Sequence, residues 1–163
     1  MKLLPYALLD ELAASATAST RRRAHHNIHA NPADPVQRFI VVAQPDSYFR
    51  PHRHLARAEL AVILRGRVEV LTFDKHGRVT ARYAVGEGTA NLAYETPAAT
   101  WHTLIAAANG AAFLEVKQGP YDPATMSEFA AWAPAEGEPS VARFQQWVRT
   151  AVPGDAAPRA EPG

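Results

Sequence analysis

Cysteine is absent from the chain of 163 residues. This absence excludes disulfide bonds, thiolate metal ligands and thiol nucleophiles together, although it says little about the cellular compartment. Long hydrophobic runs are also missing, and none approaches the roughly 20 apolar residues that a membrane-spanning helix needs. Near the N-terminus, Asp10 and Glu11 interrupt the apolar core that a secretory signal peptide requires. We therefore expect a soluble cytoplasmic protein.

The chain also lacks an excess of charge of either sign. It has 17 lysine and arginine residues against 16 aspartate and glutamate residues, which gives a formal net charge of +1 at pH 7. So close a balance provides no general attraction to nucleic acid or to an anionic membrane. The length is that of one domain with a substantial hydrophobic core. Evidence for a function must therefore come from local patterns.

Short apolar segments separated by turn residues fill the middle of the chain. Strands are expected at residues 36–44, 48–51, 59–65, 67–73, 79–85, 100–107 and 112–118. This spacing favours a β-sandwich or β-barrel over alternating strands and helices. Apolar residues three or four apart predict helices at residues 5–18 and 139–148, and residues 127–132 suggest a single helical turn.

The same patterns divide the chain into four consecutive segments. Residues 1–30 form an N-terminal helix and a basic arm packed on the barrel, and residues 31–120 form the barrel itself. A C-terminal loop and helix occupy residues 121–152. Residues 153–163 are rich in alanine, proline and glycine, which predicts a disordered tail.

Three histidines and one glutamate have the spacing of a metal site. His52 and His54 are separated by one residue, so on a strand their side chains share a face. Glu59 begins the next apolar run, and His102 is the candidate fourth ligand. Three neutral imidazoles and a carboxylate suit divalent Fe, Mn, Zn, Ni or Co, and the ligand types alone do not choose among these metals.

The same residues carry a resemblance to the cupin superfamily. Its first motif, His-x-His, four residues, Glu, six residues and Gly, resembles the run from His52 to Gly66. Its second motif, Pro, four residues and His, resembles the run from Pro97 to His102. Asp46, Asn91 and Ala99 stand where glycines are usual, and Ala106 replaces a late asparagine. None of these departures is a metal ligand, so they bear on turn geometry more than on chemistry.

A closer resemblance is to the WbuC-type cupin-fold metalloproteins. It rests on the runs RRRAHHNIHA, QPDSYFRPHRH, GTAN, ETPAATWHTL and LEVKQGPYDP, and it covers roughly residues 21–134. The resemblance implies an all-β cupin jelly-roll β-barrel with short flanking helices. Because proteins of this type tend to be encoded among surface-polysaccharide biosynthesis genes, it also implies a role in making O-antigen or lipopolysaccharide.

Residues 21–29 concentrate arginine and histidine. One interpretation is a solvated basic segment. The other is a set of groups over the mouth of the barrel that receives an anionic substrate, since the arginine fork binds phosphate or carboxylate bidentately. The candidate substrate-binding residues are Arg23, His25, His26, Tyr48, Arg50 and Lys117.

Two further residues are candidates for catalysis, Glu115 and His29. Glu115 and Lys117 share one face of an expected strand, opposite Leu114 and Val116. That face either lies in solvent or places both charged groups inside the barrel near the metal, as an acid–base pair or an orienting ion pair. The sequence leaves both readings open.

Three classes of function are compatible with these patterns. The first is a metalloenzyme acting on a small polar, anionic or sugar-like molecule. The second is a non-catalytic cupin that binds a small ligand through its metal. The third is a metal-independent sugar-nucleotide epimerase or isomerase, although the intact ligand set counts against it. A homodimer is also expected, because cupin sheets have exposed edges and the apolar face of the N-terminal helix needs a partner.

Overall fold

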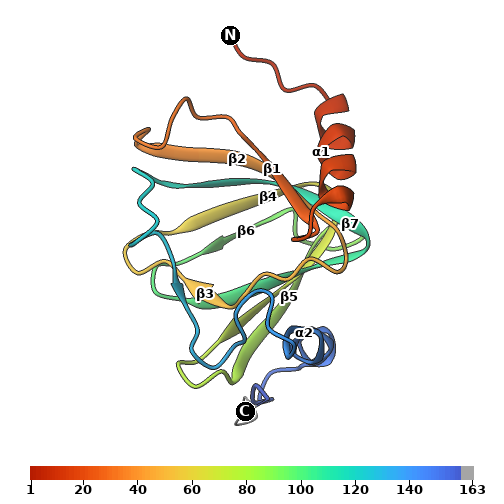
Figure 1. Ribbon diagram of the computed structural model, residues 1–163, viewed down its shortest axis with the longest axis vertical. Helices are drawn as coiled ribbons and strands as arrows, with labels where there is room; N and C mark the ends of the chain where they lie inside the picture. Colours follow the sequence, from red (N-terminus) through yellow and green to blue (C-terminus); the bar gives the residue numbers. More distant parts are fainter. Residues whose placement is uncertain (159–163) are drawn as a thin grey trace.

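Two long strands, β4 (Glu59–Phe73) and β7 (Trp101–Gln118), form the spine of the molecule. They pair antiparallel along their whole length, from Glu59 opposite Lys117 to Phe73 opposite Trp101. The computed structural model describes residues 1–158 and shows the remaining strands curving around this pair (Figure 1). These strands are β1 (Arg23–Asn27), β2 (Val36–Ala43), β3 (His52–Arg53), β5 (Val79–Gly86), β6 (Ala93–Thr96) and β8 (Glu128–Phe129).

Antiparallel pairing closes the sheet into a barrel. The strand order is β1-β2-β7-β3-β8, and β4 additionally pairs with β5, β6 and β7. Apolar side chains of β2, β4 and β7, among them Val41, Val70 and Phe113, fill one core inside it. The expected all-β barrel with short flanking helices is confirmed.

Strands β4 and β7 each continue through a glycine at which the sequence predicts a break between two shorter strands. Gly66 and Gly110 both have positive φ, at +71° and +75°, and the register of β4 against β7 shifts around Gly66. A Cβ at Gly66 would lie 2.5 Å from the carbonyl oxygen of Gly110, so the two bends need glycine to pass each other. The glycines therefore mark bends inside two strands where the sequence suggested four.

The two helices cover opposite ends of the barrel (Figure 1). Helix α1 (Ala7–Ala18) packs Leu9, Leu12 and Ala16 on β2 and β7. Its apolar face is thus covered within the chain, so the homodimer stays a prediction that rests on the sheet edges alone. Helix α2 (Val141–Thr150) packs Phe144 and Val148 on the far end of the spine. Within residues 1–158, no helix has the length and apolar character to cross a bilayer.

Two segments differ from their expected structure. Residues 127–132 contain no helical turn; β8 lies there in extended form and pairs with β3, with Glu128 opposite Arg53. At the C-terminus, residues 153–158 are held by main-chain hydrogen bonds, including one from Val79 N–H to the carbonyl oxygen of Asp155. The rest of the predicted disordered tail, 159–163, lies outside the described residues.

Candidate metal centre and adjoining cavity

Two antiparallel strands bring the three predicted histidines together. His52 on β3 lies directly opposite His102 on β7, and His54 follows at the end of β3. One ring nitrogen from each histidine lies within 4.8 Å of the others. His54 and His102 are buried and His52 is half-buried, so the cluster is largely shielded from water. This group could bind a metal ion.

Hydrogen bonds to the main chain decide which ring nitrogen faces the cluster. The Nδ1 atoms lie 2.9 Å from the carbonyl oxygen of Arg50 (His52), 2.6 Å from that of Met126 (His54) and 2.9 Å from that of Thr100 (His102). A carbonyl oxygen can only accept, so each Nδ1 carries the proton and each Nε2 keeps a lone pair. Metal-bound histidines are typically oriented in this way.

The protonation of the cluster also suits a metal ion. Burial, helped by the neighbouring His102, lowers the pKa of His52 to about 3, so this imidazole is neutral. The Nε2 atom of His102 is buried and has no hydrogen-bond partner among residues 1–158. A buried nitrogen lone pair without a partner costs free energy unless a proton donor or a cation meets it. The histidines therefore fit a divalent ion.

Glu59 lies beside this cluster at the start of β4. Its Oε2 is 2.9 Å from Nε2 of His54, and its Oε1 is 3.7 Å from Nε2 of His102. Burial opposes ionisation of Glu59, but the charge of Lys117 and the two neighbouring histidines hold its pKa well below the usual range. Since Nδ1 of His54 already holds a proton, the close approach of Nε2 to a carboxylate calls for a positive charge between them. A second proton or a metal ion would supply that charge.

Lys117 joins Glu59 to Glu115. Its Nζ is 3.0 Å from Oε2 of Glu59 and 2.5 Å from Oε1 of Glu115. The side chains of Lys117 and Glu115 are only 10% and 12% exposed, so the structure places them inside the barrel. Burial, then repulsion from Glu59, raises the pKa of Glu115 to about 8. Burial disfavours the charged form of Lys117, but the two carboxylates outweigh it and raise the pKa of this amine.

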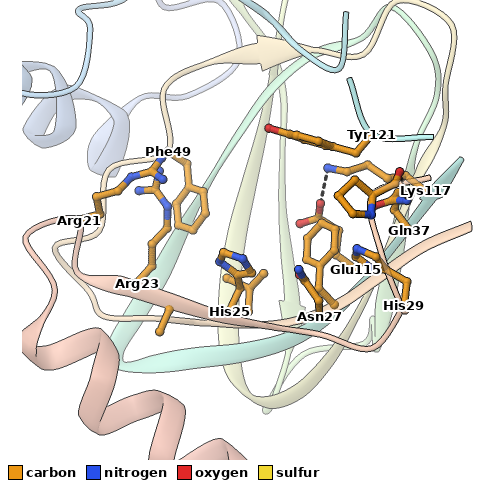
Figure 2. A pocket seen from close by; sticks show the side chains of 14 residues that line it. Arg21, Arg23, His25, Asn27, His29, Gln37, Phe49, Glu115, Lys117 and Tyr121 are labelled. Carbon is orange, nitrogen blue, oxygen red and sulfur yellow. Dashed lines mark hydrogen bonds and ion pairs between the residues drawn. The ribbon is translucent and has the colours of Figure 1, made fainter. Parts of the chain in front are cut away.

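A cavity of about 510 Å³ adjoins this network. Arg21, Arg23 and Phe49 lie at one end of it, and Lys117 and Glu115 lie at the other (Figure 2). Strand β1 forms the wall between the two ends, and the other lining residues are Ala24, His25, Asn27, His29, Pro32, Gln37, Phe39, Val41 and Tyr121. Lys117 belongs both to this wall and to the cluster around Glu59. The volume suits a small organic ligand.

Five of the predicted binding and catalytic residues line the cavity: Arg23, His25, His29, Glu115 and Lys117. His26 does not, because side chains alternate along β1 and His26 follows His25. Tyr48 is buried beneath α2, where its hydroxyl donates to the carbonyl oxygen of Pro134. Arg50 donates to the carbonyl oxygen of Ala130 and stacks on Phe129, outside the cavity.

Three of the residues that line the cavity, Asn27, Tyr121 and Phe49, are not predicted from the sequence. Asn27 continues the alternation of Arg23 and His25 and would have been found had residues 23–27 been read as a strand. Tyr121 lies in the run LEVKQGPYDP, which carries part of the family resemblance, but the glycine and prolines around it indicate a turn and give no sign of a side chain facing a ligand. Phe49 lies between two predicted residues, Tyr48 and Arg50, and faces the cavity in their place.

The unusual pKa of Glu115 predicts a pH-dependent stability. Glu115 ionises near 4.5 in the unfolded chain and near 8 in the folded one. Between these values the unfolded state binds fewer protons, so the folded state loses stability as the pH rises. Glu115→Gln removes this titration, and its stability relative to wild type should increase from about pH 4.5 to pH 8. Urea unfolding of both metal-free proteins across this range would test it, and parallel curves would contradict it.

Solved structures with a similar fold are cupin-fold proteins. Oxalate decarboxylase from Bacillus subtilis matches with 23% identity and a TM-score of 0.51 over 66% of this chain and 27% of its own. CapF from Staphylococcus aureus, a capsular polysaccharide assembling protein, matches with 14% identity and a TM-score of 0.56 over 68% and 32%. A structure described as DMSP lyases RdDddP and RnDddQII matches with 15% identity and a TM-score of 0.50 over 66% and 52%.

The chain thus spans between 27% and 52% of the length of these structures, and the likeness establishes the fold. No curated protein matches the chain. A family model described as a domain of unknown function (DUF6016) matches residues 4–85, just over half of the chain. The match includes β1 and three of the four predicted ligands, His52, His54 and Glu59. The chain belongs to the DUF6016 family.

Proposed function

We propose that the protein is a metal-dependent enzyme acting on a small polar or anionic metabolite. The observation that carries the proposal is the convergence of three Nε2 atoms beside a cavity of about 510 Å³, with Lys117 shared between the two. His52, His54 and His102 would hold the ion, and Glu59 is the proposed fourth ligand. Divalent Fe, Mn, Zn and Ni all accept such donors.

A bound divalent ion would supply Lewis acidity, which polarises a substrate oxygen. The residues of the chain would supply orientation and proton transfer. Lys117 fixes the carboxylate of Glu59 through its contact with Oε2 and offers positive charge to the end of the cavity. The main-chain carbonyl oxygens bonded to the three Nδ1 atoms hold the imidazole rings in place.

Glu115 is the proposed group for proton transfer. It lies on the wall of the cavity and contacts Lys117, so its carboxyl group can reach a ligand without leaving the ion-pair network. A proton given up by Glu115 leaves a carboxylate that Lys117 stabilises. His29, buried on the same wall with Nδ1 bonded to the main chain of Arg38, is the second candidate. Both assignments rest on the positions of these side chains in the wall of the cavity.

A sugar intermediate of surface-polysaccharide synthesis is the proposed substrate. The WbuC-type resemblance of residues 21–134 supports this choice, because such proteins tend to be encoded with genes of that pathway. The cavity also has suitable walls: the ring of Phe49 offers an apolar face, while Asn27 and His25 offer hydrogen-bonding groups. Its basic residues suit a phosphate or carboxylate on the sugar.

The proposal can be tested by a screen of sugar phosphates and nucleotide sugars against metal-loaded protein, read by mass spectrometry and NMR. We expect turnover of one class of compound that is lost in His54→Ala and reduced at least about 100-fold in Glu115→Gln, the lower range for loss of a general acid or base. Binding without turnover would favour the ligand-binding class. Turnover that survives removal of the metal would favour the metal-independent epimerase or isomerase class and contradict the proposal.

A further inference from the structure

Two arginines at one end of the cavity share a single carboxylate. The Nε and Nη2 atoms of Arg21 lie 2.7 and 2.8 Å from Oε2 and Oε1 of Glu136, which is the bidentate geometry of arginine with an oxyanion. Nη2 of Arg23 lies 2.5 Å from the same Oε1. Glu136 belongs to the segment between β8 and α2, so it reaches this site from far along the chain.

The backbone before β1 directs these two arginines to the same place. Arg22, between them, has a positive φ of 57°, and its side chain turns away to Asp46 at 2.9 Å. Arg23 is held by Tyr48, whose carbonyl oxygen lies 2.6 Å from Nη1, and by the ring of Phe49, 4.7 Å from the guanidinium carbon. This anchoring leaves one edge of the Arg23 guanidinium directed at Glu136.

Glu136 carries the same kind of negative charge that an anionic ligand would bring to the two arginines. Partial burial tends to raise the pKa of its carboxyl group, but hydrogen bonds from Arg21 and Arg23 hold the pKa below the usual value. Glu136 is therefore ionised at neutral pH. Its pair with Arg21 is exposed, with side chains 36% and 59% accessible, and exposed pairs contribute little net stability. The pair with Arg23 is more buried, since the Arg23 side chain is only 15% exposed, but an external anion would take over its hydrogen bond and could therefore replace this carboxylate at low cost.

We propose that Arg21 and Arg23 form a subsite for the terminal carboxylate or phosphate of the ligand, and that Glu136 occupies this subsite until the ligand displaces it. Arg21 and Arg23 both line the cavity, whereas Arg22, which also has a carboxylate partner, does not. Glu136 itself is not among the residues that line the cavity, so the subsite lies at its edge.

The position of the subsite defines the shape of the ligand. From Arg23 to Asn27, strand β1 extends about 13 Å along the cavity at its usual rise per residue. A ligand bound at the arginines would therefore carry its anionic group at one end and present its other end to Glu115 and Lys117 (Figure 2). That assignment rests on the proposed function, whereas competition between Glu136 and an anion does not require metal or turnover.

The test is a calorimetric titration of metal-free protein with inorganic phosphate and, separately, acetate, at constant ionic strength. Glu136→Gln keeps the shape of the side chain but removes its charge, and we expect it to bind phosphate at least about tenfold more tightly than wild type because the internal competitor is weakened. In this background Arg21→Gln should abolish the gain. Arg22→Gln, which removes an equal charge outside the cavity, should leave it intact.

Comparing phosphate with acetate shows which kind of anionic group the arginine subsite binds. A gain for phosphate alone assigns the subsite to a phosphate, and a gain for both anions assigns it to either oxyanion. Unchanged affinity in Glu136→Gln, or no saturable binding of either anion, would overturn the proposal and leave Glu136 as a structural contact. A gain in Glu136→Gln together with a failed substrate screen would keep the subsite and reject the proposed enzyme.

Discussion

Replacing His54 by alanine is expected to remove the divalent ion and to lower the melting temperature by about 5 to 10 °C when metal is present. His54 is buried, its Nδ1 proton is bonded to the main chain, and its Nε2 faces Glu59. An ion at 100 times its dissociation constant stabilises a folded protein by about 2.7 kcal/mol, and in a domain of this size about 1 kcal/mol corresponds to roughly 2 to 4 °C. Elemental analysis and calorimetry would measure the two effects.

His76 provides the matched control. It lies exposed in the turn between β4 and β5 and is not one of the three converging histidines, so His76→Ala should keep its metal and its melting temperature. Chelation offers a second check, because it should bring the melting temperature of wild type down by a similar amount while changing that of His54→Ala little. A His54→Ala protein that still responds fully to chelation would contradict the role of His54.

Replacing Lys117 by methionine is expected to destabilise the metal-free protein by about 3 to 5 kcal/mol. The side chains of Glu59 and Glu115 are only 6% and 12% exposed, and Lys117 is the amine that contacts both of them. Its loss would leave two buried acidic groups without their positive partner. Urea unfolding would measure the free energy of unfolding of both proteins.

Two further variants make this prediction specific. Adding Glu115→Gln to Lys117→Met removes one of the stranded carboxyl groups and should recover part of the lost stability. Arg65→Met breaks the exposed ion pair with Asp10, whose side chain is 71% accessible, and should cost only about 0 to 1 kcal/mol. Equal losses in Lys117→Met and Arg65→Met would show that the buried network contributes no more than a surface pair.

The histidine cluster could be predicted because its geometry follows from short spacings. His52 and His54 have a fixed relation on any strand, and Glu59 follows after one short connection. The pairing of His52 with His102 across two strands did not follow from spacing alone, and the cupin motif supplied it. The carbonyl oxygens that orient the rings could not be predicted, since the hydrogen bond from His54 to Met126 joins residues 72 positions apart.

The cavity could be predicted only in part, because its wall is a strand without an apolar pattern. Apart from Ala24, residues 23–27 carry polar side chains, and their pairing with β2 is what makes them extended. Tyr48 and Arg50 were predicted to bind substrate at the mouth of the barrel, but Phe49, which lies between them, is the residue that faces the cavity. The contact of Glu136 with Arg21 spans 115 residues and has no local signal at all.

The barrel itself was easier to predict than its strand boundaries. Apolar runs and turn residues indicated a β-barrel, but a glycine in a strand can mark either an end or a bend. Gly66 and Gly110 lie at bends, where a Cβ on Gly66 would come within 2.5 Å of the carbonyl oxygen of Gly110. This close approach exists only once the two long strands have paired. The single sequence could not distinguish these outcomes.

The most direct test of the metal centre is the metal content of the protein purified without added metal, compared with that of His52→Ala/His102→Ala. These two histidines face each other across β3 and β7 and supply two of the three converging nitrogens. We predict one divalent ion per chain in wild type and none in the double variant. Full metal occupancy in the double variant would contradict the assignment of the site.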